Sequence, residues 1–116
     1  MRESISLDGV EMHVSSTAAQ GVVGAGTRLR FQQRGSRVVG RYAGGGVKRG
    51  CLVGSVSGGS HVFRYAQVEA SGQLHAGRSV CEVLRTLSGR VRVVECFEWT
   101  TREGRGTNVF DELTPI

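Results

Sequence analysis

The sequence predicts an all-β protein, a single antiparallel up-and-down β-barrel of about eight strands. Glycine occurs 18 times and proline once, and glycine-containing turn signals recur at intervals of roughly ten residues. The segments between these turns are short and rich in Val, Tyr, Phe and Thr, which favour extended backbone. Short links make successive strands antiparallel neighbours, and closure of the sheet removes its two unpaired edges.

The strands can be placed along the chain from the turn signals. We expect them at residues 10–16, 27–34, 37–43, 47–56, 61–69, 73–84, 90–100 and 107–113. The clearest is 27–34, where Leu29 and Phe31 alternate with polar residues, as in a strand with one buried face. Gly77 predicts a bulge or bend in 73–84. Residues 16–25 are small and predict a loop or one helical turn, and the chain 1–116 is expected to be one domain.

Composition limits the class of protein. The chain has 116 residues, of which 39% are hydrophobic and 22% charged. No apolar run is long enough for a bilayer span or a secretory signal, so we expect a cytoplasmic protein. The three cysteines are Cys51, Cys81 and Cys96; none forms a CxxC pair or lies near a histidine in the sequence. We therefore expect no disulfide, no metal site and no cofactor.

The formal net charge is +5, which permits an anionic partner. The arginines are spread along the chain without a dense basic run, and only 6% of residues are aromatic. Nucleic acid is therefore not an expected partner. If it binds, the contacts would come from Arg28, Arg30, Arg34, Arg90 and Arg92, and binding would be weak and non-specific.

The most informative candidate residue is Glu95. In 90–100, every second residue from Val91 to Trp99 lies on one face, and that face is apolar except for Glu95. A carboxyl group inside a barrel needs a partner or a raised pKa. We expect an ion pair with Arg64 or Arg78; the alternative is a weakly partnered Glu95 that acts as a catalytic acid or base.

For two other strands the sequence does not decide which face points into the barrel. In 61–69 either Phe63, Tyr65 and Gln67 point inward, or Val62 and Arg64 do. In 73–84 the inward candidates are Arg78 and Glu82, or Ser79 and Cys81. The interior is either a ligand pocket or a core filled by its own side chains, since eight-stranded barrels of both kinds exist.

Four segments of the chain resemble a known family. They are G-x-Y-x-G-G at Gly40, Tyr42, Gly44 and Gly45; F-R-Y-x-Q at 63–67; G-x-S at Gly77 and Ser79; and E-x-W-x-W, matched at Glu95 and Trp99 with Phe97 replacing the first Trp. Over about 31–112 the chain resembles a family of small bacterial proteins often labelled N-acetylglutamate synthase. The strand pattern is similar in architecture to avidins and lipocalins, members of the calycin-like barrels. Transferases that use acetyl-CoA commonly bind its pyrophosphate at a helix N-terminus, which this sequence does not offer.

Three functions remain open from the sequence. The first is a small-molecule-binding barrel with the ligand inside, lined by Tyr42, Phe63, Gln67, Ser79, Phe97 and Trp99. The second is a cofactor-free isomerase or cyclase with Glu95 as acid or base, and Tyr65 or Arg64 as hydrogen-bond donor. The third is a basic barrel that binds nucleic acid. The oligomeric state is open, with a homodimer as one option.

Overall fold

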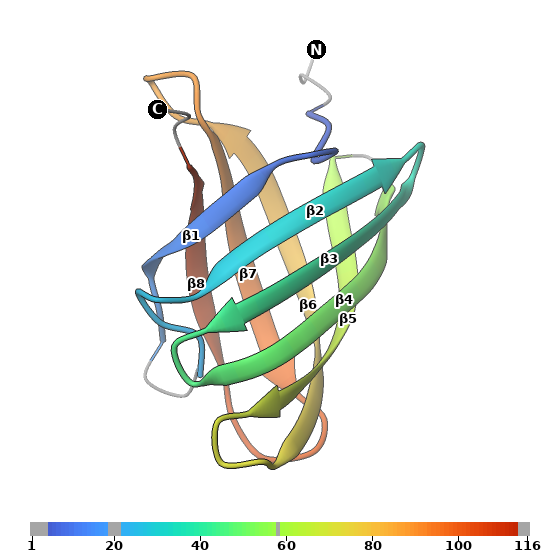
Figure 1. Cartoon of the computed structure of the whole chain (residues 1–116). Coiled ribbons are helices and arrows are strands. Elements are labelled where there is room, and N and C mark those ends of the chain that lie inside the picture. Colours follow the sequence, from blue (N-terminus) through green and yellow to red (C-terminus); the bar gives the residue numbers. More distant parts are fainter. Residues whose placement is uncertain (1–4, 19–21, 58, 114–116) are drawn as a thin grey trace.

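The protein is a closed eight-stranded barrel (Figure 1). The computed structural model describes residues 5–18, 22–57 and 59–113. The strands are β1 (Glu11–Ser16), β2 (Arg28–Arg34), β3 (Arg37–Gly44), β4 (Val47–Ser57), β5 (Ser60–Glu69), β6 (Leu74–Arg85), β7 (Val91–Trp99) and β8 (Arg105–Glu112). All eight predicted strands are confirmed, with bounds that agree within two residues.

The sheet is an up-and-down meander, in which each strand pairs with its neighbour in the chain. The barrel closes where β1 pairs antiparallel with β8, for example Val14 opposite Phe110. The described residues of the β1–β2 connection form a loop without a helical turn. The described residues contain no helix with the length and hydropathy of a membrane span.

Large aromatic side chains of the interior face glycines on the neighbouring strand. These cross-strand pairs are Phe31–Gly40, Tyr42–Gly50, Phe63–Gly54, Tyr65–Gly77 and Phe97–Gly106. A methyl group on Gly50 or Gly77 would overlap the ring of the paired tyrosine, so each ring occupies the space that a side chain would take. The predicted bulge at Gly77 is wrong, because the β5–β6 register runs through it without a shift. Glycine is required there for close approach of Tyr65.

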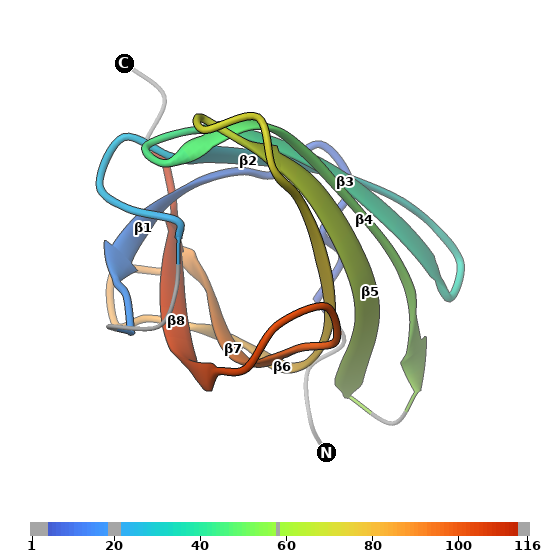
Figure 2. The same cartoon turned by 90° about the horizontal axis from the view of Figure 1, so that it is seen from below.

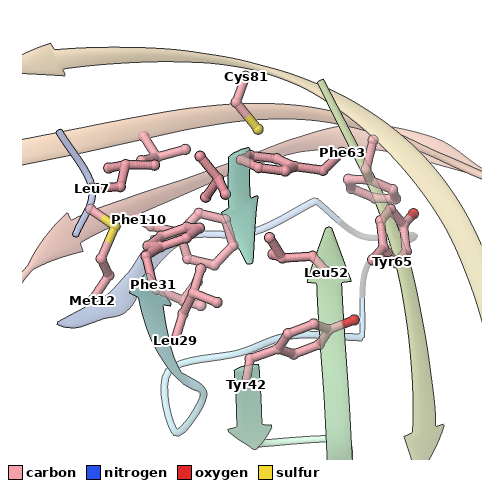
Figure 3. Close-up of a cluster of buried hydrophobic side chains, with 14 of the residues drawn as sticks. Leu7, Met12, Leu29, Phe31, Tyr42, Leu52, Phe63, Tyr65, Cys81 and Phe110 are labelled. Atoms are coloured by element: carbon pink, nitrogen blue, oxygen red, sulfur yellow. The ribbon is translucent and has the colours of Figure 1, made fainter. Parts of the chain in front are cut away.

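The two ends of the barrel differ in chemistry. We call them the Leu7 end, where β1 begins, and the Trp99 end, where β7 finishes. The Leu7 end is filled by buried apolar side chains, including Leu7 and Met12, neither of which is exposed to solvent. In Figure 3 these two lie on the opposite side of the cluster from Tyr42 and Tyr65, which carry hydroxyl groups. Figure 2 looks at the Trp99 end, where the β1–β2, β3–β4, β5–β6 and β7–β8 connections lie.

Candidate ligand site inside the barrel

A cavity lies in the middle of the barrel, between the apolar Leu7 end and the polar Trp99 end. Its volume is about 40 Å³, which corresponds to roughly three water molecules. The apolar part of its wall comes from Leu29, Phe31, Leu52, Phe63, Val93 and Phe110. Val22 and Val23 of the β1–β2 loop also line it and pack against the core. The cavity is therefore mostly apolar, and a loop contributes part of its wall.

Glu95 is the one carboxyl group on the cavity wall within the described residues. The strand alternation predicted its inward direction, and the structure confirms it. The Asn108 amide donates from Nδ2 to Glu95 Oε1 over 3.0 Å, and the Ser79 hydroxyl also hydrogen-bonds the carboxyl. Burial raises the pKa of Glu95, and these two hydrogen bonds oppose that rise only in part. Glu95 is thus held by neutral partners, in surroundings that favour its protonated form.

The expected ion pair of Glu95 with an arginine is wrong. Arg64 and Arg78 both lie on the outer face of the barrel and are exposed. Arg78 pairs with Glu98 instead, with Nη2 2.7 Å from Oε1. The reason is the strand period of two: β5 turns Phe63 and Tyr65 inward, so Arg64 between them must point outward. Arg64 is therefore excluded as a donor to anything bound in the interior.

Asn108 connects the carboxyl to the β1–β2 loop. Its Oδ1 accepts hydrogen bonds from Thr17 Oγ1 at 2.9 Å and from the Ala18 amide at 3.3 Å, while its Nδ2 donates to Glu95. Asn108 is buried. The same side chain thus fixes the loop that lines the cavity and the carboxyl group inside it.

A chain of polar side chains extends from the cavity to the Trp99 end. Tyr42 Oη donates to Gln67 Oε1, and Gln67 Nε2 donates to Glu69 Oε2, each over 2.9 Å. Arg102 completes the chain with two bonds to Glu69, at 3.1 Å from Nη1 and 2.5 Å from Nη2. The Arg102 guanidinium also lies 4.0 Å from the centre of the Trp99 ring, a cation–π contact. This chain closes the Trp99 end with groups that satisfy one another.

Several pKa values follow from these surroundings. The Arg102 hydrogen bonds hold the pKa of Glu69 below its ordinary value. Burial raises the pKa of Tyr42 and that of Tyr65, and the Glu95 charge adds to both shifts. The Tyr65 hydroxyl donates to the Glu98 carbonyl oxygen at 3.4 Å. Both tyrosines therefore remain neutral donors at any physiological pH.

Most of the other predicted site residues converge on this interior. Tyr42, Phe63, Tyr65, Gln67, Phe97 and Trp99 line the cavity together with Glu95. Ser79 is buried and contacts Cys81 at 3.9 Å between Oγ and Sγ. Of the two faces left open for 61–69 and 73–84, the structure selects Phe63–Tyr65–Gln67 and Ser79–Cys81 as the inward ones.

Sequence reasoning missed Asn108, the Glu69–Arg102 pair and His61. Asn108 falls on the inward side of β8 by simple alternation with Phe110, so its position was available from the pattern. His61 is 2% exposed, and neither of its ring nitrogens has a hydrogen-bond partner. It lies near the Leu7 end beside Phe63, and burial lowers its pKa.

Comparison with known proteins identifies the family. No curated protein sequence and no solved structure matches the chain. Its resemblance to proteins labelled N-acetylglutamate synthase stays untested. The family model described as avidin-like protein matches residues 5–113, nearly the whole chain. The closed antiparallel eight-stranded barrel of the structure is consistent with an avidin-like fold. The chain therefore belongs to the avidin-like family.

Proposed function

We propose that the barrel binds a small, uncharged, mostly apolar molecule in its interior, with one polar group directed at Glu95. The observation that carries this proposal is a carboxyl group on an apolar cavity wall with only neutral partners, Asn108 and Ser79. A protonated Glu95 donates a hydrogen bond, so it suits a ligand carbonyl or hydroxyl oxygen. An anionic ligand would lose its hydration without meeting a positive charge, because no Arg, Lys or His among the described residues lines the cavity.

The family supports binding of this general kind, because avidin-like barrels bind small ligands such as biotin. The size of the cavity limits the ligand. A volume of about 40 Å³ admits only a few non-hydrogen atoms unless side chains move. The wall residues that come from a loop instead of a strand are Val22 and Val23. Their displacement breaks no strand pairing, so a larger ligand would take their place first.

Trp99 provides the assay, because it is the single tryptophan and lines the cavity. We would titrate the protein with three uncharged carbonyl compounds, 2-pyrrolidinone, cyclopentanone and biotin methyl ester, and follow tryptophan fluorescence. The test variant is Cys81→Leu, which adds volume at the cavity wall. The matched control is Cys96→Leu, which makes the same exchange at an exposed position on the next strand. Melting curves would check that both variants fold.

Binding in the barrel predicts a saturable fluorescence change in the wild type and in Cys96→Leu, weakened at least tenfold in Cys81→Leu. Equal affinities in all three proteins would contradict the interior site. Native mass spectrometry of the protein from its own cells would extend the search beyond these three probes. The proposal fails if that spectrum shows no retained small molecule and no probe binds.

A cofactor-free isomerase or cyclase is a second candidate, favoured by the raised pKa of Glu95. Such a pKa suits a general acid, and Tyr65 is the remaining candidate donor because Arg64 points outward. A molecule retained by the protein would be incubated with wild type and with Glu95→Gln. Turnover by the wild type, with binding but no turnover by the variant, would establish the enzyme. Unchanged ligand with both proteins would favour the carrier.

We also propose a cytoplasmic location. The support is that Cys51, Cys81 and Cys96 are all free thiols, which is usual for proteins of a reducing compartment. Fractionation of the native cells with an antibody against the protein would test this.

A further inference from the structure

Cations that are dispersed along the sequence lie together on one surface of the folded barrel. Four adjacent strands, β2 to β5, form one half of the barrel wall (Figure 1). Their exposed cations are Arg28, Arg30, Arg34, Arg37, Arg41, Lys48, Arg49 and Arg64, and we call this surface the basic face. The arginines are dispersed along the sequence, but the fold brings these eight cations onto one half of the wall. Arg92, named with Arg28, Arg30 and Arg34 as a candidate contact, lies on β7 and pairs with Asp111.

No acidic side chain balances the basic face from within it. The single carboxylate on β2 to β5 is Glu69, which faces inward and pairs with Arg102. Glu11 on β1 lies opposite Arg30 in the register, but no ion pair joins them. Among the described residues, none of the eight cations forms an ion pair. On the other half of the wall, by contrast, Arg78 and Arg92 pair with neighbouring carboxylates.

Like charges also lie directly opposite one another on neighbouring strands. Arg30 faces Arg41, and Arg34 faces Arg37. Such pairs destabilise a sheet, and a bound anion would relieve the repulsion. Arginine is suited to this because its planar guanidinium binds phosphate oxygens through two hydrogen bonds at once.

We infer that the basic face binds the sugar–phosphate backbone of double-stranded nucleic acid, without reading its sequence. This inference does not depend on a ligand inside the barrel. A duplex is favoured over a single strand because none of the exposed residues of β2 to β5 is aromatic, so bases have no ring to stack on. A membrane is disfavoured because the exposed large apolar residues of β2 to β5 are Val39, Val53 and Val62, and none is an aromatic or leucine side chain of the kind that inserts into a bilayer surface.

The test uses fluorescence anisotropy with a labelled 20-base-pair duplex of mixed sequence, titrated with the full chain at several salt concentrations. If four of the cations contact phosphates, raising the salt from about 50 to about 200 mM weakens binding about 150-fold. The test variant is Arg30→Gln/Arg41→Gln, which removes a repulsive pair and so keeps the fold. The control is Arg90→Gln/Arg105→Gln, which removes the same charge from exposed positions outside the basic face.

We expect the test variant to reduce the slope of log affinity against log salt by about two, and the control to leave that slope unchanged. Equal losses in the two variants would overturn the inference, because they would show only an effect of net charge. It would also be overturned by tighter binding to a single strand of the same length. Binding to phosphatidylserine vesicles with no binding to the duplex would assign the basic face to a membrane instead.

Discussion

Exchange of Glu95 for glutamine should stabilise the protein near neutral pH. Glutamine keeps an oxygen for the Asn108 amide to donate to, and it removes the charge that burial disfavours. The pKa of Glu95 is raised from 4.5 in the folded state. The folded state therefore binds more protons than the unfolded state above pH 4.5, and the wild type loses stability as the pH rises through that region.

The size of the effect follows from this linkage. Above the unfolded pKa, each pH unit lowers the stability of the wild type by up to about 1.4 kcal/mol, until the folded pKa is passed. Between about pH 5.5 and 7.5 the advantage of Glu95→Gln should thus grow by up to about 2.7 kcal/mol. A domain of this size shifts its melting temperature by roughly 3–6 °C for each kcal/mol, so the difference is large enough to measure.

Urea unfolding at the two pH values measures the effect, with Glu98→Gln as the control. Glu98 lies three residues further along β7, faces outward and pairs with the exposed Arg78, so its loss should change stability by less than about 1 kcal/mol at either pH. Two results would contradict this expectation. One is a Glu95→Gln variant that is less stable than the wild type at pH 7.5; the other is an effect of the same size at both pH values.

Three further substitutions have definite expected outcomes. Gly77→Ala should cost roughly 1–3 kcal/mol of stability, because the added methyl group overlaps the ring of Tyr65. The control Gly24→Ala should be near neutral, because its methyl group meets no atom within 4 Å. Equal melting temperatures of the two variants would contradict this prediction. Arg102→Ala should cost about 1–3 kcal/mol at pH 7, because Glu69 (side chain 9% exposed) loses its ion pair. That ion pair lowers the pKa of Glu69, so the extra stability of the wild type over Arg102→Ala should disappear as the solution is acidified below that pKa. If the wild type remains more stable in acid, the ion pair is not the source of the difference. His61→Leu should raise stability by about 1–2 kcal/mol, because it removes two buried ring nitrogens that have no hydrogen-bond partner. The gain should increase below pH 6.5, where unfolding lets the wild-type ring take up a proton. A loss of stability in urea unfolding would contradict this and show that the ring has a partner.

The strands and the inward direction of Glu95 were predictable because both depend on local information. Turn glycines mark the strand ends, and alternation assigns each side chain to a face. The contact between Glu95 and Asn108 was not predictable, because it depends on the register of the β7–β8 hairpin, which alternation alone does not give. Asn108 lies directly opposite Glu95 only once β7 and β8 are paired in register.

The charge distribution also depends on strand pairing, which local sequence information does not give. The arginines at 30 and 41 are separated in the sequence by a hairpin, yet they lie side by side on the barrel. Composition counted the cations correctly, but only the strand order shows that half of the wall holds eight of them. Conversely, Arg64 was a plausible interior donor until the inner face of β5 was known.

The pairing of aromatic rings with glycines has a consequence for how this barrel can change. Because each ring fills the space that a side chain on the opposite glycine would need, neither residue can be exchanged freely without the other. A smaller residue at Tyr42 opens a gap that alanine at Gly50 would partly fill, while either change alone is unfavourable. The interior should therefore adapt to new ligands by coupled two-residue steps. Libraries that vary Tyr42 with Gly50, or Tyr65 with Gly77, would find folded variants that single substitutions miss.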